Sequence, residues 1–311
     1  MFGSKPAPAP TGLYEWFPTW AESQADLGHL PPVRADSIKP PATFAGAHLG
    51  FFTSEDMDYF DGYAWTRWTS EHWGIPLVAV SIYLVMIPLL RSHVAKSGKY
   101  NTRTFALWWN VFLSVFSMVG LSACAPVMLS ELWNNGTDFT ICANASWYGH
   151  GWHGLWVALF IYSKFFELID TVLLLLASRS VILLHWWHHL TVLLYCWHAY
   201  STRPGTGLWY ATMNYGVHSI MYAYFAATQH GKAAREAVKP FAIYITLLQL
   251  TQMVVGIAVT VRAVVVQSGG GECHVNKTNS ILGLLMYLSY FLLFLKLFID
   301  SYVVKGGKKV Q

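Results

Sequence analysis

The sequence predicts an all-α polytopic membrane protein with seven transmembrane helices, and three features carry that prediction. Hydrophobic residues make up 54% of the 311 positions and charged residues 12%, about half of the roughly 25% that is usual in soluble domains. Seven apolar runs reach the length of about 20 residues that a helix needs to cross a bilayer. The short connections and the lack of alternating strand patterns favour helices over a β-barrel.

Each predicted helix is an apolar run long enough to cross a bilayer. In chain order we expect them at Gly74–Arg91, Phe105–Ser130, Trp152–Ala177, Val181–Tyr200, Gly207–Ala227, Pro240–Val266 and Ser280–Val303. They form one domain over 74–304, preceded by a segment over 1–73 and followed by a tail over 305–311. The chain does not open with a charged start, short apolar core and cleavage site, so the first helix is expected to direct membrane insertion.

Loop charges predict the orientation of these helices. If the first helix runs from the far side to the cytosol, the opposite loops hold only Arg203 and Lys277. The cytosolic loops and tail then hold eleven basic residues, namely Arg91, Lys96, Lys99, Arg103, Arg179, Lys232, Arg235, Lys239, Lys305, Lys308 and Lys309. Because cytosolic loops carry an excess of Lys and Arg, the N-terminus is predicted to be lumenal and the C-terminus cytosolic.

The far-side loops carry signs of a eukaryotic secretory membrane. Three N-x-S/T sequons lie there, at Asn135, Asn144 and Asn276, on the side that is competent for glycosylation. Cys142 and Cys273 are placed in the same two loops, while Cys124 and Cys196 fall within helices. An oxidising lumen favours a Cys142–Cys273 disulfide, and two free lumenal thiols are the alternative.

Residues 1–73 differ in composition from the rest of the chain. Residues 1–45 are rich in Pro and Ala, which is typical of a flexible arm. The later stretch MDYFDGYAWTRWTSEHW mixes acids with Tyr and Trp and suits a helix at the membrane interface. The net charge of +4 comes from cytosolic Lys and Arg, so no nucleic-acid partner is expected.

Four of the predicted helices carry polar stripes at a common depth. The stripes are Lys164, Glu167, Asp170 and Thr171 on the third helix, His185, His188 and His189 on the fourth, Asn214, His218 and Tyr222 on the fifth, and Gln249 and Gln252 on the sixth. Spacings of three and four place each stripe on one helical face, and the helix rise places all four in the cytosolic half. Buried polar groups in a membrane are expected to face a cavity and serve function.

The polar layer has other interpretations. Lys164 and Glu167 can form a structural charge pair, and Asn214 or Gln249 can hydrogen-bond between helices. The His-x-x-His-His spacing also occurs in membrane di-iron desaturases and hydroxylases, because neutral imidazole binds iron. Such sites need several histidine boxes, whereas this chain offers one box plus His218. No metal site is therefore predicted, and acid–base or nucleophilic catalysis by imidazole is favoured.

Four boxes, KFFELIDT, HWWHH, NYGVHSIMY and TLLQLTQ, resemble in order and spacing the signatures of the ELO family of fatty acid elongases. The resemblance covers roughly residues 74–302 and includes the Trp109–Asn110 pair. It implies a seven-helix enzyme of the endoplasmic reticulum with a narrow acyl tunnel. Such an enzyme condenses acyl-CoA with malonyl-CoA to 3-ketoacyl-CoA, carbon dioxide and coenzyme A, with no further cofactor. The boxes look closer to members that extend saturated and monounsaturated chains, and the tail KKVQ looks like a di-lysine retrieval signal.

The resemblance also implies roles for individual residues. His188 is expected to take the acyl group as an acyl-imidazole, with His218 as its partner in malonyl-CoA decarboxylation or in stabilising the enolate. His185 and His189 complete the polar site or support it. Substrate positioning or support is expected of Lys164, Glu167, Asp170, Thr171, Asn214, Tyr222, Gln249 and Gln252. Both CoA substrates and membrane lipid are expected partners, while other enzymes of the elongation cycle and a second copy of the chain are left open.

A tunnel entered from the cytosol must lie along the helices, so its closed lumenal end is expected to set product length. Trp209, Met213 and Met253 are predicted near the terminus of the acyl chain.

The alternatives to an elongase are a non-enzymatic lipid transporter and a retinal-binding photoreceptor. A photoreceptor would form its Schiff base on Lys296, one turn before Asp300. A snorkelling Lys296 paired with Asp300 is the structural alternative. A photoreceptor leaves the histidine layer unexplained, and a transporter would leave malonyl-CoA unconsumed.

Overall fold

The structure, a computed structural model, describes residue 60 and residues 62–304, and it contains no β-strand in this part of the chain. The helices are α3 (Gly62–Glu71), α4 (Gly74–Ser97), α5 (Arg103–Cys142), η3 (Ala145–Trp147), α6 (Gly151–Glu167), α7 (Ile169–Leu176), α8 (Leu183–Thr202), α9 (Gly207–His230), α10 (Lys232–Val238), η4 (Lys239–Phe241), α11 (Ala242–Ser268), α12 (Lys277–Phe298) and η5 (Ile299–Val304). The predicted arm over 1–45 and the tail over 305–311 lie outside the described residues. Residues 62–71 of the predicted interfacial segment are helical.

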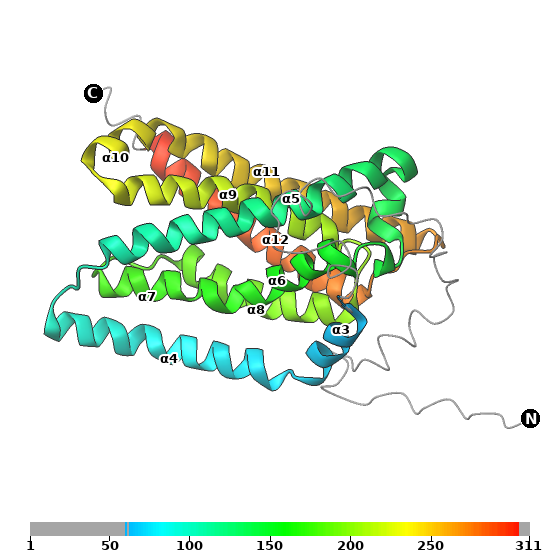
Figure 1. Cartoon of the computed structure of the whole chain (residues 1–311), viewed down its shortest axis with the longest axis horizontal. Coiled ribbons are helices and arrows are strands. Elements are labelled where there is room, and N and C mark those ends of the chain that lie inside the picture. Colours follow the sequence, from blue (N-terminus) through cyan, green and yellow to red (C-terminus); the bar gives the residue numbers. More distant parts are fainter. Residues whose placement is uncertain (1–59, 61, 305–311) are drawn as a thin grey trace, which may run out of the picture.

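The long helices lie side by side in one bundle (Figure 1). α4 runs along one edge of it and packs on α7 and α8, while α5 packs along α9 and α11 packs along α12. α10 lies at one end of the bundle, called here the α10 end, and α3 lies at the opposite end. Close packing is allowed by small residues, since a Cβ atom added to Gly256 of α11 would lie 2.6 Å from the ring of Tyr287 on α12.

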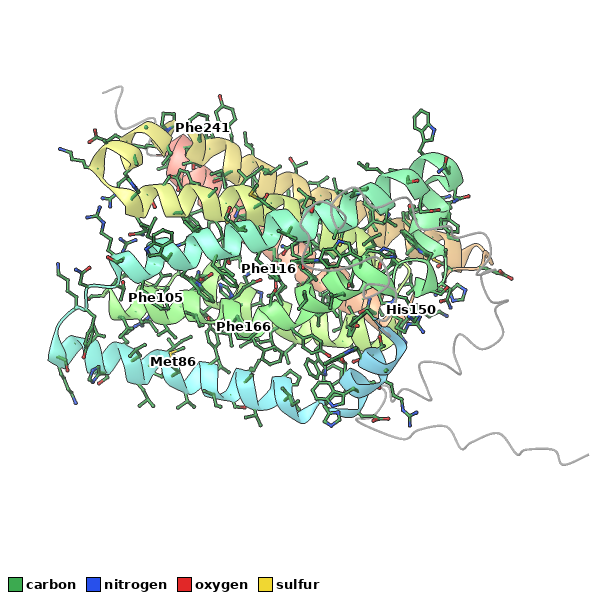
Figure 2. The ribbon with its side chains drawn as sticks, viewed as in Figure 1. Met86, Phe105, Phe116, His150, Phe166 and Phe241 are labelled. Atoms are coloured by element: carbon green, nitrogen blue, oxygen red, sulfur yellow. A yellow bond between two sulfur atoms is a disulfide. The ribbon has the colours of Figure 1, made fainter. Side chains whose placement is uncertain are left out.

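The outer face of the bundle is apolar. Four segments are long and apolar enough to cross a membrane, namely Gly74–Ser97, Arg103–Cys142, Lys232–Ser268 and Lys277–Val304. Large exposed side chains such as Phe105, Phe166 and Phe241 lie on this outer face (Figure 2), where lipid tails would solvate them. The other long helices carry most of the predicted polar layer, which lowers their hydropathy. The chain is therefore an all-helical membrane protein.

Two predicted helices differ most from the observed ones. The second continues past Ser130 to Cys142, and its last part bends at Gly136, whose φ of 82° is easy for glycine. Cys142 is therefore the last residue of a helix, and the expectation that it lies in a loop is wrong. The third predicted helix is divided at Leu168 into α6 and α7.

A disulfide ties together the end of the bundle that lies opposite α10. It joins Cys142 to Cys273 in the connection between α11 and α12. Beside it, His274 N donates to the Cys142 carbonyl at 2.8 Å, and Gly205 N donates to the His274 carbonyl at 2.7 Å. These bonds hold the end of α5, the α8–α9 connection and the α11–α12 connection against one another. This end of the bundle is called here the disulfide end. A cross-link between residues so far apart stabilises the fold mainly by restricting the unfolded chain.

Candidate active site

The predicted polar layer surrounds an internal cavity of about 370 Å³. The members of the layer that line it are His185, His188, His189, His218, Asp170, Asn214, Tyr222, Gln249 and Gln252. Much of the remaining wall is apolar or aromatic, with Phe160, Val192 and Met253 among its residues. Lys164, Glu167 and Thr171 lie behind this wall and contact the lining residues from outside. The cavity thus combines an apolar bore with imidazole groups at one level.

A buried ion pair supports the layer from α6. Lys164 Nζ lies 2.6 Å from Glu167 Oε1, and both side chains are almost fully buried. Lys164 also donates to Asn214 Oδ1 at 3.2 Å and lies over the ring of Phe160. Because a buried charge is costly without a partner, these contacts hold α6 against α9. The predicted charge pair is therefore formed, and it lies directly behind the site.

The ion pair between Lys164 and Glu167 is also linked to His218, a candidate catalytic residue. Asn214 Nδ2 lies 3.2 Å from His218 Nε2, and Glu167 Oε1 lies 4.0 Å from His218 Nδ1. Both ring nitrogens of His218 are therefore close to polar groups that are themselves held by Lys164. His218 is buried and its ring packs against Tyr222 one turn further along α9. The orientation of this imidazole is thus fixed by α6 and α9 together.

Two adjacent residues of α7, Asp170 and Thr171, contact different neighbours. Asp170 accepts hydrogen bonds from Trp109 Nε1 at 2.7 Å and from Tyr222 Oη at 2.9 Å, which links α7 to α5 and α9. Thr171 instead contacts α4 and α8. The predicted shared face is therefore confirmed for Lys164, Glu167 and Asp170, which contact Asn214, His218 and Tyr222 of α9, and it is wrong for Thr171.

Thr171 connects the histidine box to a residue that sequence reasoning missed. Its Oγ1 lies 2.9 Å from His185 Nε2 and 2.8 Å from the hydroxyl of Tyr83 on α4. Tyr83 is only 2% exposed, although α4 is the most peripheral of the long helices. A single tyrosine in an apolar run carries no pattern, so the sequence offered no signal for this contact.

The three histidines of α8 have different surroundings. The rings of His185 and His189 have centroids 4.5 Å apart, and those of His188 and His189 lie 5.2 Å apart. His189 is buried, whereas His188 is half-buried and lies against Tyr290 of α12. Tyr290 Oη also donates to the His188 carbonyl at 3.2 Å. Among the described residues no hydrogen bond is made by the His188 ring, which is therefore available to a molecule in the cavity.

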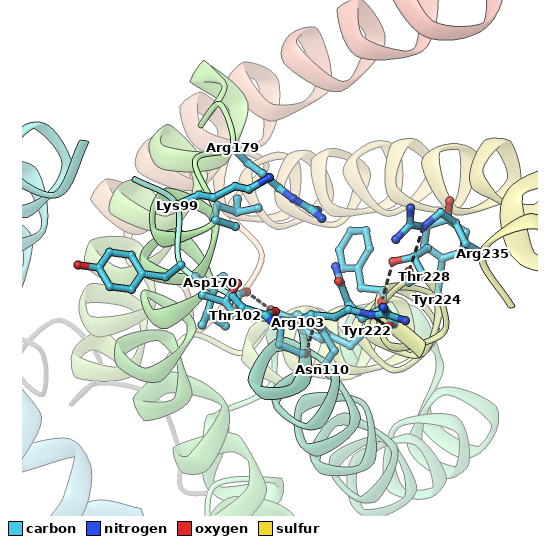
Figure 3. Close-up of a pocket in the computed structure, with 18 of the residues that line it drawn as sticks. Lys99, Thr102, Arg103, Asn110, Asp170, Arg179, Tyr222, Tyr224, Thr228 and Arg235 are labelled. Carbon is cyan, nitrogen blue, oxygen red and sulfur yellow. Dashed lines mark hydrogen bonds between the residues drawn. The ribbon is translucent and has the colours of Figure 1, made fainter. Parts of the chain in front are cut away.

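A wider pocket of about 620 Å³ adjoins the cavity and is called here the vestibule (Figure 3). Asp170, His185 and Tyr222 line both spaces, so the vestibule meets the cavity at the histidine layer. The vestibule is strongly basic, since its lining includes Lys99, Arg103, Arg179 and Arg235. In the sequence these cations indicate the orientation of the helices, and their shared sign is also a signal for an anion-binding site.

Arg103 and Arg235 also shape the wall of the vestibule. Arg103 donates to the carbonyls of Gln229 and His230 at the end of α9, at 2.8 and 3.0 Å. Arg235 Nε donates to the Thr228 carbonyl at 3.1 Å. The start of α5 and the short helix α10 are thereby held to the end of α9, and the guanidinium groups stay beside the opening.

The three residues predicted near the acyl terminus differ in their position relative to the cavity. Met253 lines it, whereas Trp209 and Met213 are not among its lining residues. Trp209 donates to Thr140 Oγ1 of α5 at 3.2 Å. Trp209 and Met213 pack against the buried cluster that contains Met253, and their predicted place near the acyl terminus stays a prediction.

The structure also bears on the retinal site and the metal site that were the alternatives. Lys296 Nζ lies 2.8 Å from Asp300 Oδ2, and both side chains are exposed on the outside of α12 and η5, away from the interior position that a retinal Schiff base would need. In the part of the chain that the structure describes, no three His, Cys, Asp or Glu side chains are grouped as metal ligands.

Comparisons with known proteins agree with this arrangement. The sequence profile described as "ELO: GNS1/SUR4 family" matches residues 68–310. Fatty acid elongase 3 of Trypanosoma brucei brucei is 39% identical over 277 residues, which cover 81% of this chain and 91% of that protein. Very long chain fatty acid elongase 6 of Gallus gallus is 37% identical over 265 residues, covering 84% and 98%. Putative fatty acid elongase 3 of Caenorhabditis elegans is 35% identical over 252 residues, covering 81% and 78%.

Replacing Lys164 with Met is expected to destabilise the protein by about 3–5 kcal/mol, because Glu167 would stay buried without its cation. Thermal unfolding in detergent measures the effect. Lys296→Met is the matched control, since the exposed pair with Asp300 contributes about 1 kcal/mol or less. The double variant Lys164→Met/Glu167→Leu should recover much of the loss. Equal unfolding temperatures for Lys164→Met and Lys296→Met would contradict a supporting role for the buried pair.

Proposed function

Because the chain belongs to the ELO family of fatty acid elongases, it condenses an acyl-CoA with malonyl-CoA in fatty acid elongation, and we propose that the reaction proceeds through an acyl-imidazole on His188. One observation carries the choice of His188. Among the four candidate histidines, His185 has a ring nitrogen hydrogen-bonded to Thr171, and His218 has one hydrogen-bonded to Asn214. His189 is buried. The His188 ring faces the cavity without such a bond.

The first half of the proposed reaction is acyl transfer to His188. A neutral ring nitrogen attacks the thioester carbonyl, the carbon–sulfur bond breaks, and coenzyme A leaves with the proton that the imidazole gives up. The apolar wall of the cavity favours the neutral ring, because burial disfavours charge. An acyl-imidazole remains activated, so the difficult carbon–carbon bond formation becomes a separate step.

The second half uses malonyl-CoA. Loss of carbon dioxide leaves the electron pair of the broken bond on the acetyl-CoA enolate, whose carbon attacks the acyl carbonyl. The carbon–nitrogen bond breaks with its electron pair on the imidazole nitrogen, which takes up one proton from water, so that His188 returns to its neutral form and 3-ketoacyl-CoA is released. His218, held by Asn214 and Glu167, is placed to stabilise the negative oxygen of the enolate. Atoms and electrons balance with the two substrates and one proton from water, so we propose that no further cofactor takes part.

The vestibule is proposed to hold the CoA part of both substrates. Coenzyme A carries several phosphate groups, and Arg and Lys side chains recognise phosphate by charge and hydrogen bonding. Lys99, Arg103, Arg179 and Arg235 surround an opening that leads to His185 and on to His188. The headgroup thus stays in the basic vestibule while the thioester enters the histidine layer and the acyl chain enters the apolar bore.

The membrane arrangement proposed for the chain follows the loop charges. We propose seven spanning helices within residues 74–304 around an acyl tunnel, in the membrane of the endoplasmic reticulum, with the α10 end in the cytosol. The disulfide between Cys142 and Cys273 supports a lumenal position for the opposite end. The di-lysine sequence in the tail is then proposed to be read in the cytosol. Substrates are proposed to be saturated and monounsaturated acyl chains.

The two half-reactions separate the roles of His188 and His218. His188→Ala is expected to lose both the release of coenzyme A from acyl-CoA alone and the condensation, by at least about 100-fold. His218→Ala should still release one equivalent of coenzyme A per protein while condensation falls by a similar factor. Thiol release and labelled-malonyl product formation are measured separately. His198→Gln, on the same helix but outside the cavity lining, serves as control. Coenzyme A release at the normal rate in His188→Ala would contradict the mechanism.

Arg179→Ala is expected to raise the KM for both CoA substrates about three- to five-fold with little change in kcat, because it removes one exposed phosphate contact. The difference from the wild type should shrink at high salt. Arg91→Ala is the matched control, since Arg91 is exposed in α4 near the same end and does not line the vestibule. A fall in kcat at unchanged KM would place Arg179 outside CoA binding.

The three N-x-S/T sequons differ in their structural roles. If the disulfide end is lumenal as proposed, these roles predict which asparagine carries a glycan. Asn144 accepts a hydrogen bond from Ser146 N and caps η3, and Asn276 accepts one from Asn279 N and caps α12. Asn135 is exposed. We expect a single glycan, lost in Asn135→Gln and retained in Asn144→Gln and Asn276→Gln, as measured by gel mobility before and after glycosidase treatment. A shift that depends on Asn144 or Asn276 would contradict this assignment.

A further inference from the structure

One residue of the peripheral helix α4 reaches the histidine box. The buried residues of α4 are Pro76, Tyr83 and Val94. Tyr83 lies near the middle of the helix, nine residues after its start at Gly74, which is about 14 Å along the axis. In a chain that spans a bilayer this depth is hydrocarbon, where a hydroxyl group needs a partner inside the protein. For Tyr83 that partner is Thr171 of α7, at 2.8 Å.

Thr171 uses its hydroxyl group differently from other helical threonines of this chain. Several of them donate the hydroxyl hydrogen to the backbone carbonyl four residues earlier, namely Thr66, Thr69, Thr191 and Thr260. Among the described residues, Thr171 makes no such bond, and its Oγ1 contacts only the hydroxyl of Tyr83 and Nε2 of His185, the latter at 2.9 Å. The three groups therefore form a hydrogen-bonded chain from α4 through α7 to α8.

The hydrogen atoms of this chain are placed by counting donors and acceptors. Tyr83 is 2% exposed and Thr171 is 0% exposed, and each hydroxyl group has one hydrogen to donate. If His185 Nε2 carried a hydrogen and donated it to Thr171, the hydrogen of either Thr171 or Tyr83 would be left in the interior without an acceptor, which is costly. Every hydrogen is used only when Tyr83 donates to Thr171 and Thr171 donates to His185 Nε2.

This arrangement fixes the tautomer of His185. A ring nitrogen that accepts a hydrogen bond carries no hydrogen, so the ring is neutral and its one hydrogen lies on Nδ1. Among the described residues, Nδ1 of His185 makes no hydrogen bond, since the contact of the ring with Thr171 is through Nε2. His185 lines both the vestibule and the cavity. Its Nδ1–H group is therefore the remaining donor of the ring at the junction of the two spaces.

We propose that Tyr83 and Thr171 are positioning residues that keep the Nδ1–H group of His185 free to donate a hydrogen bond to the carbonyl oxygen of the acyl thioester. The inference rests on the acyl transfer to His188 proposed above and adds the group that stabilises the oxygen. His185 precedes His188 on α8 by three residues, about 4.5 Å along the axis, on the side of the vestibule.

The proposed hydrogen bond acts on charge that develops during the reaction. When the His188 nitrogen attacks the thioester carbonyl, negative charge appears on the carbonyl oxygen, and a donor that is already held in place stabilises it. The hydrogen stays on Nδ1 throughout this step, so no proton is transferred through Thr171 or Tyr83. Their task is to hold the tautomer that presents the donor.

The tautomer is measured by NMR on the full chain in detergent with isotope-labelled histidine, because ring nitrogens with and without hydrogen resonate at different frequencies. The signals of His185 are identified by their loss in His185→Ala. We expect hydrogen on Nδ1 in the wild type and a mixture of both tautomers in Tyr83→Phe, where Thr171 is free to accept from Nε2. Hydrogen on Nε2 in the wild type would overturn the proposal.

The catalytic consequence is measured as the rate of coenzyme A release from acyl-CoA alone, in single turnovers. Tyr83→Phe is expected to slow this release about three- to ten-fold without changing the KM for acyl-CoA, because the hydrogen bond acts in the transition state and not in binding. Thr171→Val should slow it further, and Thr171→Ser should keep most of the rate because serine keeps the hydroxyl group.

Tyr162→Phe is the matched control. The hydroxyl of Tyr162 also pairs with that of a threonine on another helix, Thr69, at 2.6 Å, but Tyr162 lines neither the cavity nor the vestibule. Its loss should leave the release rate and the tautomer of His185 unchanged.

A double variant separates positioning from a structural role. Tyr83→Phe should have no further effect on the release rate in His185→Ala, because the hydrogen-bonded chain then has no ring to position. Equal slowing by Tyr83→Phe in both backgrounds would overturn the proposal, as would a wild-type release rate in Tyr83→Phe. Wild-type protein that forms product without releasing coenzyme A from acyl-CoA alone would contradict the proposed acyl transfer, whereas the NMR result on the tautomer does not depend on it.

Discussion

The buried ion pair between Lys164 and Glu167 is the contact on which the geometry of the site depends. It lies at the end of α6, just before the break at Leu168, and through Asn214 it reaches His218 on α9. In a bilayer such charges must be satisfied inside the protein, because lipid offers neither water nor counter-ions. The pair therefore fixes the positions of α6 and α9 and holds the His218 imidazole beside the cavity without exposing a charge to lipid.

The polar residues that follow this pair have two tasks. Asp170 is held from α5 and α9, while Thr171 joins α4 to His185. Adjacent residues of a helix point about 100° apart, so one short segment supports the two sides of the histidine layer. The His188 ring is left for the substrate because its neighbours are held by other residues.

Polarity changes in steps along the path through the protein. The vestibule is basic, the histidine layer is polar, and the bore beyond it is largely apolar. An acyl-CoA molecule has the same order of groups, with phosphates, a thioester and a hydrocarbon chain. This match between the order of environments and the order of chemical groups is the basis for the proposed direction of substrate entry.

Sequence periodicity was enough to predict the helices and the level of the polar layer, since apolar run length and spacing of three and four depend on local geometry. It did not predict the break at Leu168 or the contact from Tyr83, because both depend on packing between helices. Depth along a helix follows from residue number, but the direction of a side chain depends on how the whole helix is rotated against its neighbours.

The most direct test of the proposed chemistry is the mass of the protein after exposure to acyl-CoA alone. Peptides from the quenched protein are analysed by mass spectrometry with fragmentation that locates the modified residue. The mechanism predicts one acyl group on His188, which disappears when malonyl-CoA is added. An acyl group on Cys196 or His218, or condensation at the full rate with no acyl group on any residue, would contradict an acyl-imidazole intermediate at His188.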